Sequence, residues 1–151
     1  MITVAIGADH AGFQEKDLIV QFLRDTLHVT VVDCGTNSSE RVDYPDIAAT
    51  VGHVVTEHKA QMGILICGTG IGMCISANKI EGVRCALCHD HYTARMARLH
   101  NDANVLAVGA RTTGMEVIKE IVETFLKEVH AGGHHADRVA KISALESKKP
   151  S

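Results

Sequence analysis

The stretch Met62-Gly-Ile-Leu-Ile-Cys67-Gly-Thr69-Gly-Ile-Gly-Met-Cys-Ile-Ser-Ala-Asn78 decides the fold. It opens with the apolar run 64–66, which is typical of a strand buried on both faces of a sheet. Glycines follow at alternate positions, and a helical pattern begins after them. Such a turn exposes backbone N–H groups and the positive end of a helix, so the stretch predicts an anion-binding turn.

The end of this predicted strand carries a thiol, Cys67. A helix N-terminus favours the thiolate form, which can act as a base or a nucleophile. The alternative is a buried, unreactive cysteine, the commoner role of this residue type. The turn is not a dinucleotide fingerprint, because Met73 replaces the third glycine, and no Lys-Ser or Lys-Thr follows as in nucleotide hydrolases.

Strand and helix patterns alternate along the whole chain. Strands are expected at residues 2–6, 29–32, 64–66, 83–88 and 104–108, with helices between them and after the last strand. This order predicts an α/β fold in which a five-stranded parallel sheet carries helices on both faces. One helix face is expected to consist of Leu18, Ile19, Phe22 and Leu23.

A single domain is expected over residues 1–147. Its last helix, about 136–147, has no strand left to cover and is therefore a candidate for packing on a partner chain. Residues 148–151 are expected to form a loose tail.

Composition narrows the range of partners and compartments. The chain has 151 residues, 46% of them hydrophobic and 3% aromatic, with a net charge of −3, which argues against nucleic acid as a partner. It contains neither a signal-peptide pattern nor an apolar stretch as long as a membrane span. The odd count of five cysteines indicates reduced thiols. A cytoplasmic protein without a membrane partner is therefore expected.

Polar residues gather where the predicted strands end, which is where ligands bind in parallel sheets. The candidates there are Asp9, His10, Asp33, Cys67, Thr69, His89, Asp90 and Arg111, with Asp43, His100 and Asn101 in flanking loops. Asp9 is equally compatible with a structural turn that accepts backbone N–H bonds. A thiol, an anion turn, histidines and carboxylates together suit proton transfer beside the carbonyl of an anionic substrate.

Two further groups of polar residues are interpreted as structural. Cys85 and Cys88 have the spacing of zinc ligands, but residues three apart in a strand face opposite sides, and no second pair of ligands is spaced to close the site. No metal site is therefore predicted. Three arginines, Arg84, Arg95 and Arg98, are expected to be surface or interface charges.

Six motifs, in order from residue 2 to about 145, resemble the type B ribose-5-phosphate isomerases. The six motifs contain the segments Gly7-Ala-Asp9-His10, Ser39-Glu-Arg-Val-Asp43-Tyr44-Pro45, Ile66-Cys67-Gly-Thr69, Ala77-Asn78-Lys79, His100-Asn101-Asp102 and Gly109-Ala-Arg111. The wider family includes allose-6-phosphate and galactose-6-phosphate isomerases. The resemblance implies a three-layer Rossmann-like fold, interconversion of ribose 5-phosphate and ribulose 5-phosphate without a metal or organic cofactor, and a homodimer or dimer of dimers with a shared active site.

The resemblance also implies a role for each site residue. Cys67 corresponds to the base that moves a proton between carbons 1 and 2 through an enediolate. Thr69 assists proton movement between the two oxygens, and His100, helped by Asp43, opens the sugar ring. Substrate binding is expected from the N–H groups of the turn and from the following residues: Asp9, His10, Tyr44, Gly68, Gly70, Ile71, Gly72, Asn101, Arg111, His134 and Arg138. His134 stands where many relatives carry another phosphate-binding arginine.

Two alternative functions remain open at this point. One is an isomerase of a six-carbon aldose 6-phosphate, although Cys67, Thr69, His100 and Asp43 on one chain favour a self-sufficient enzyme. The other is a non-catalytic sugar-phosphate-binding module, which would need the anion turn but not the combination of Cys67 and His100.

Overall fold

The computed structural model describes residues 2–146, and the expected tail at 148–151 lies outside the described residues. The strands are β1 (Thr3–Ala8), β2 (Thr30–Asp33), β3 (Met62–Cys67), β4 (Cys85–Leu87) and β5 (Val105–Gly109). The helices are α1 (Phe13–Asp25), α2 (Tyr44–Thr56), α3 (Ile71–Ala77), α4 (His91–Leu99), α5 (Met115–Lys127) and α6 (His134–Glu146). All strands pair in parallel, in the order β2-β1-β3-β5-β4, as the alternating pattern predicts.

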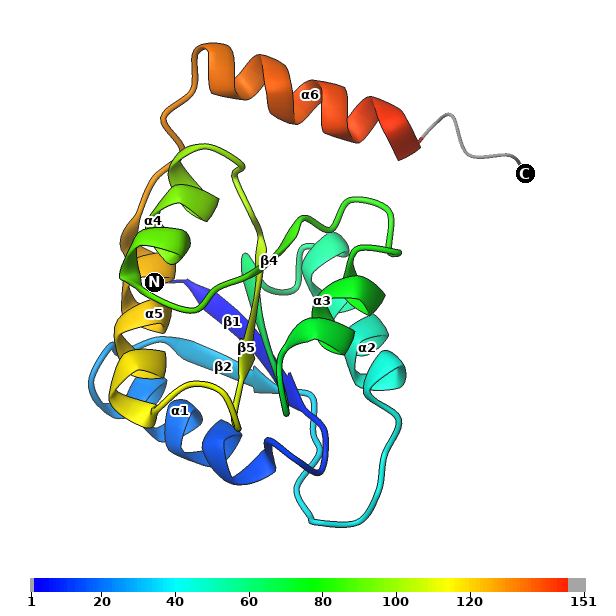
Figure 1. Ribbon diagram of the computed structural model, residues 1–151, viewed down its shortest axis with the longest axis vertical. Coiled ribbons are helices and arrows are strands. Elements are labelled where there is room, and N and C mark those ends of the chain that lie inside the picture. The colour runs from blue at the N-terminus through cyan, green and yellow to red at the C-terminus, as the bar shows by residue number, and fades with distance from the viewer. Residues whose placement is uncertain (1, 147–151) are drawn as a thin grey trace.

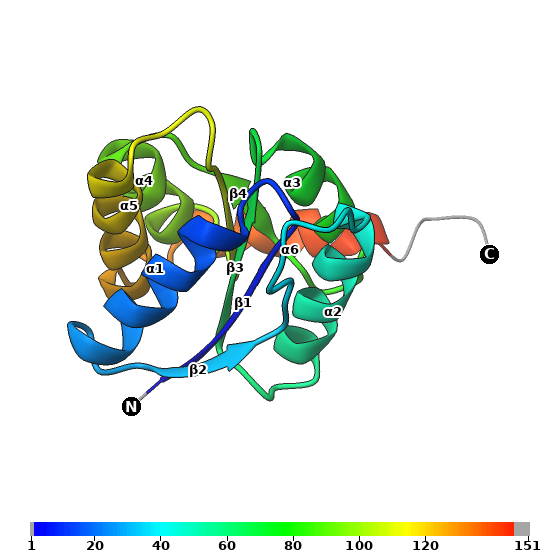
Figure 2. The same ribbon diagram turned by 90° about the horizontal axis from the view of Figure 1, so that it is seen from below.

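The sheet lies between two helical layers, with α1, α4 and α5 on one face and α2 and α3 on the other (Figure 2). Alternate residues of the central strands feed the two layers. Ile64 and Ile66 pack among the side chains of α1, α4 and α5, whereas Leu65 and Cys67 pack with those of α2 and α3. The central strands are buried on both faces, as their uninterrupted apolar runs predict.

Predicted site residues lie at the carboxyl end of the sheet, and helix α6 lies beyond its amino end. The chain leaves β1 for β2 on one side and later reaches β3 on the other, so β1 and β3 flank a topological switch point. The carboxyl ends of these two strands carry Asp9 and Cys67. Helix α6 lies beyond the opposite, amino end of the sheet (Figure 1).

Several boundaries and faces differ from the sequence-based expectation. Helix α4 extends to Leu99 rather than Met96, and α6 begins at His134. Leu18 is half exposed, because the buried stripe of α1 is formed by Lys16, Ile19, Val20 and Leu23. The expectation that Arg98 is a surface or interface charge is wrong, since Arg98 is only 8% exposed within the single chain.

Helix α6 packs loosely on the rest of the chain. No residue of its described part is buried, and Ile142 and Leu145 are exposed. A groove of about 420 Å³ separates these side chains from the β4 edge of the sheet, where Asn78, Arg84 and Cys85 line it. Within residues 2–146, no helix is both long and apolar enough to cross a membrane.

Candidate active site

The turn after β3 brings backbone N–H groups to the Cys67 thiol. The N–H of Gly70 donates to Cys67 Sγ at 3.2 Å, and the N–H of Ile71 donates to Thr69 Oγ1 at 3.2 Å. Gly70 has φ +80°, and a Cβ there would lie 2.6 Å from a methyl group of Leu87, so only glycine fits. Cys67 is 5% exposed, whereas Thr69 lies at the surface. The turn therefore holds a buried sulfur beside an exposed hydroxyl.

The loop after β1 lies directly beside this turn. The N–H of Asp9 donates to the carbonyl of Ile66 at 3.1 Å, and Asp9 Oδ1 accepts from the N–H of Ala11 at 2.9 Å. Asp9 thus forms a structural turn, which was one of its two roles compatible with the sequence. This turn lies next to β3, the strand that ends in Cys67. His10 accepts from the N–H of Val42 at 3.4 Å, which joins this loop to the segment carrying Asp43.

Two more predicted site residues border the glycine turn. The ring of Tyr44, at the start of α2, packs on Gly72 and leaves no space for a Cβ there. The N–H of Arg111 donates to the carbonyl of Gly68 at 2.9 Å, and its guanidinium lies within about 4 Å of the position that a Cβ on Gly68 would take. Tyr44 and Arg111 are both exposed, so they are available to a ligand over the turn.

A buried lysine supports this end of the sheet. Lys16 is completely buried and donates to both carboxylate oxygens of Asp33, at 2.9 and 2.8 Å, and to Asn37 Oδ1 at 2.9 Å. Asp33 Oδ1 also accepts from the N–H of Gly35 at 2.9 Å. The cation therefore fixes the first part of the loop that leads to Asp43.

The remaining predicted site residues gather at the start of α6. The ring of His100 stacks on that of His135, with centroids 4.1 Å apart and planes 10° from parallel, and His134 contacts His135 at 4.1 Å. Arg138 follows one turn later on α6. This group, which we call the α6 half-site, consists of His100, Asn101, His134, His135 and Arg138. His135 was not predicted, and its ring contact with His100 is a tertiary feature.

The α6 half-site lies at the opposite end of the sheet from the residues around the thiol. We call this second group the Cys67 half-site; it consists of Asp9, His10, Asp43, Tyr44, residues 67–72 and Arg111. Val105 pairs with Gly63 and Gly109 with Cys67, so the start of β5 lies about 13 Å along the strand from the level of the thiol. His100 precedes β5, on the side away from Cys67. One chain therefore brings together Asp9, His10, Asp43, Tyr44, the glycine turn and Arg111, but not His100, Asn101, His134 or Arg138.

His135 lies among other basic side chains in the α6 half-site. Partial burial lowers the pKa of His135, and the neighbouring His134, His100, Arg138 and His130 lower it further, because a second cation is unfavourable beside them. His135 is thus kept neutral over more of the pH range. An anion placed between these rings and Arg138 would relieve the repulsion.

Other thiols lie close to the glycine turn. Cys74 Sγ donates to the carbonyl of Cys85 at 3.5 Å. A hydrogen bond from the Cys85 thiol lowers the pKa of Cys74 to about 7, and burial raises that of Cys88 to about 12. Cys85 and Cys88 belong to different core layers, which confirms that they face opposite sides of the sheet. Residues 2–146 contain no group of three or more side chains suited to holding a metal ion.

Two buried cations, Lys16 and Arg98, were missed although the helical pattern contains a signal for each. Lys16 precedes Ile19 and Leu23 by three and seven residues, which places it on the buried face of α1. Arg98 follows the buried Ala94 by four residues on α4. Charged side chains at such positions are buried only when they find partners, and the partners come from distant segments.

A glycine turn that holds a buried thiol thus lies at the switch point of a parallel sheet, where ligands bind in α/β proteins of this kind. Residues 4–142 match the family model described as Ribose/Galactose Isomerase, and the chain belongs to this family.

Similar proteins match over nearly their whole length. The chain is 46% identical over 149 residues to ribose-5-phosphate isomerase B of Escherichia coli, covering 99% of each chain. It is 45% identical over 150 residues to D-erythrulose-4-phosphate isomerase of Pectobacterium atrosepticum, covering 99% of this chain and 98% of the relative. The solved structure of Clostridium thermocellum ribose-5-phosphate isomerase B matches with a TM-score of 0.95 at 46% identity. The match covers 97% of this chain and 99% of that one. The predicted Rossmann-like α/β fold is confirmed.

Proposed function

We propose that this protein interconverts ribose 5-phosphate and ribulose 5-phosphate, a reaction of the pentose phosphate pathway. The observation that carries the proposal is the contact between the Gly70 N–H and Cys67 Sγ, in a chain similar over its full length to ribose-5-phosphate isomerase B. An N–H donated to sulfur stabilises a thiolate, which is the form that can remove a proton.

The proton transfer runs through an enediolate. Cys67 removes the proton from carbon 2 of the open aldose and returns it to carbon 1, giving the ketose. Backbone N–H groups of the turn at residues 68–72 would hold the developing oxyanion. The exposed hydroxyl of Thr69 would pass a proton between the two substrate oxygens, since its Oγ1 already accepts one N–H bond and keeps its own proton to donate.

Ring opening and phosphate binding complete the proposal. His100, assisted by Asp43, would move a proton between the ring oxygen and the hydroxyl on carbon 1, which converts the furanose to the aldehyde. Asp9, Tyr44 and Asn101 would contact the sugar. The phosphate would bind His10, Arg111, His134 and Arg138, four side chains that offer donors to a dianion.

A homodimer, or a dimer of dimers, would join the two half-sites. Within one chain His100 and Asp43 belong to groups at opposite ends of the sheet, which supports a site built from two chains. Helix α6 offers exposed Ile142 and Leu145 beside the β4 edge, a surface suited to a second copy. A two-fold axis would then place the α6 half-site of each chain over the Cys67 half-site of the other. All five cysteines are free, which fits the cytoplasm.

A second substrate is supported by the relative named D-erythrulose-4-phosphate isomerase, and the family description keeps six-carbon sugars as an alternative. Purified protein should be assayed with EDTA on ribose 5-phosphate, D-erythrulose 4-phosphate, allose 6-phosphate and galactose 6-phosphate. We expect the highest kcat/KM on ribose 5-phosphate. A higher kcat/KM on another sugar would make that sugar the proposed substrate. Binding without turnover of any sugar would favour the non-catalytic module.

A further inference from the structure

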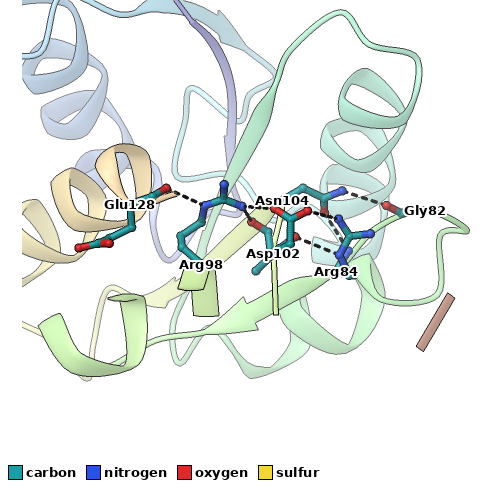
Figure 3. Close-up of polar contacts among 7 residues, drawn as sticks. Gly82, Arg84, Arg98, Asp102, Asn104 and Glu128 are labelled. Carbon is teal, nitrogen blue, oxygen red and sulfur yellow. Dashed lines mark hydrogen bonds and ion pairs between the residues drawn. The ribbon is translucent and has the colours of Figure 1, made fainter. Parts of the chain in front are cut away.

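A buried arginine fixes the turn that carries His100 and Asn101. The Arg98 guanidinium donates from Nη1 to the Ala103 carbonyl at 2.6 Å and to Asp102 Oδ1 at 3.0 Å, and from Nε to the Glu128 carbonyl at 3.4 Å (Figure 3). The guanidinium carbon of Arg98, Cζ, lies 5.7 Å from the centroid of the Phe125 ring. These contacts join α4, the start of β5 and the end of α5.

Asp102 is the residue on which this turn depends. It has φ +45°, in the left-handed region that few non-glycine residues adopt, Asp being among those that tolerate it. Its carboxylate accepts from Arg98 and lies 3.6 Å from Arg84 Nη2, while its carbonyl accepts from Arg84 Nε at 3.0 Å (Figure 3). The two arginines therefore hold the backbone conformation that directly follows His100 and Asn101.

The same arginine also anchors the chain that leads to α6. Glu128, whose carbonyl accepts from Arg98, is the first residue after α5. Three residues later, the N–H of Ala131 donates to the carbonyl of Leu99 at 3.0 Å. Arg98 thus contacts both segments that build the α6 half-site, although it touches none of the side chains proposed to meet substrate.

We infer that Arg98 is a positioning residue for the ring-opening step. His100 is exposed in the single chain, and it must reach a sugar held by another chain with a precision better than about 1 Å to transfer a proton efficiently. A planar fork that donates in several fixed directions meets this need better than an ammonium group. The inference rests on the proposed role of His100.

The test separates ring opening from enolisation. Ribose 5-phosphate is a furanose, whereas ribulose 5-phosphate is open, because its O5 carries the phosphate. Exchange of the C1 proton of ribulose 5-phosphate in D₂O therefore needs Cys67 but no ring chemistry. In Arg98→Met we expect conversion of ribose 5-phosphate at saturating substrate to fall about 10- to 100-fold, while the exchange, measured at saturating ribulose 5-phosphate so that weaker phosphate binding does not enter, stays within about twofold of the unmodified protein.

Two variants on the same helix serve as controls. Arg98→Lys keeps the charge for Asp102 but cannot donate to all three acceptors, so it should restore conversion in part. Arg95→Met removes an exposed arginine whose contact is an ion pair with Glu128 at 3.4 Å, and both rates should stay unchanged. Equal losses of conversion and exchange in Arg98→Met would overturn the inference.

His100→Asn distinguishes failure of this inference from failure of the proposed function. If His100→Asn lowers both rates equally, the ring-opening role of His100 is wrong and the inference falls with it. If His100→Asn is selective but Arg98→Met is not, only the inference is wrong.

Mixed assemblies supply a readout that does not depend on proton exchange or on the stability of one variant. Arg98→Met chains mixed with Cys67→Ala chains should recover activity as fully as His100→Asn chains do, since the defect lies in the α6 half-site. Recovery with His100→Asn but not with Arg98→Met, in mixed dimers shown to form, would mean that Arg98 supports the whole subunit and would overturn the inference.

Discussion

The two half-sites are each held by a buried cation, but the two cations act differently. Lys16 binds side-chain oxygens of Asp33 and Asn37, at the carboxyl end of the sheet. Arg98 binds two backbone carbonyls and Asp102, at the amino end. The Cys67 half-site stands on strand ends that the sheet already orders, whereas the α6 half-site stands on the ends of helices. Irregular backbone needs a donor for its carbonyls, which explains the arginine there.

The largest effect should come from removing the thiol. Cys67→Ala is expected to lower turnover by about 10²- to 10⁴-fold, because the general base is lost, while substrate binding persists. Steady-state kinetics and a binding titration measure the two effects. Cys74→Ala is the matched control and should keep its turnover, although alkylating reagents will also label Cys74, whose pKa is about 7. Retention of most turnover in Cys67→Ala would transfer the base role to Thr69 or a carboxylate.

Mixing inactive chains tests whether the half-sites come from two subunits. Cys67→Ala and His100→Asn chains, mixed one to one, should regain about a quarter of the original activity, because each mixed dimer has one intact site. Cys67→Ala with Asp9→Ala should regain none, since both residues lie in the Cys67 half-site. Co-expression with two tags isolates the mixed dimers. If isolated mixed dimers of the first pair stay inactive, each chain builds its own site.

Arg111 provides a second test of this arrangement. It lies beside Gly68 and therefore belongs with Cys67 rather than with the α6 half-site. Arg111→Ala should therefore fail to complement Cys67→Ala. Complementation by Arg111→Ala would place the arginine in the partner's site and contradict the single-chain geometry.

Stability should depend strongly on Lys16. Lys16→Met keeps the volume but leaves Asp33 without its cation, and we expect the free energy of unfolding to fall by about 1–3 kcal/mol, less than for a fully buried pair because the Asp33 side chain is 31% exposed. Urea denaturation measures this loss. Asp17→Asn, at an exposed carboxylate 3.2 Å from Lys16, should change stability by less than about 0.5 kcal/mol. A loss for Lys16→Met as small as that for Asp17→Asn would mean that the buried hydrogen bonds of Lys16 are not stabilising.

Substrate affinity should change more modestly at His134. Arginine offers a permanent charge and a planar fork of donors to a phosphate, whereas histidine offers at most two N–H groups. His134→Arg should therefore lower the KM for ribose 5-phosphate severalfold at neutral pH. His53→Arg, at an exposed site on α2, controls for the added charge. An unchanged KM in His134→Arg would remove His134 from the phosphate site.

The smallest effect concerns the stacked rings. Since the pKa of His135 is lower in the folded chain, the unfolded chain binds a proton more readily as the pH falls below about 6.5, and stability declines with it. His135→Phe keeps a ring beside His100 and cannot be protonated. Thermal unfolding at pH 5.5 and 7.5 should show a smaller acid-induced drop in Tm for this variant. An equal drop would assign the acid sensitivity to other groups.

The sequence by itself determined the parallel sheet and the thiol turn, and it named every residue of the two half-sites as a candidate except His135. These features follow from local patterns, namely apolar runs, alternate glycines and polar residues at strand ends, together with motifs specific to one family. Lys16 and Arg98 show where local patterns end, because a charge on a buried helix face has meaning only with partners such as Asp33 or the Glu128 carbonyl.

Only the tertiary structure decided which site residues meet. Along the sequence His100 is close to Arg111, yet the strand between them carries the chain from one end of the sheet to the other, so Arg111 joins Cys67 and His100 does not. The stack of His100 on His135 likewise joins two helices that no spacing relates. Proximity across a sheet depends on strand direction and length, which appear only when the chain is folded.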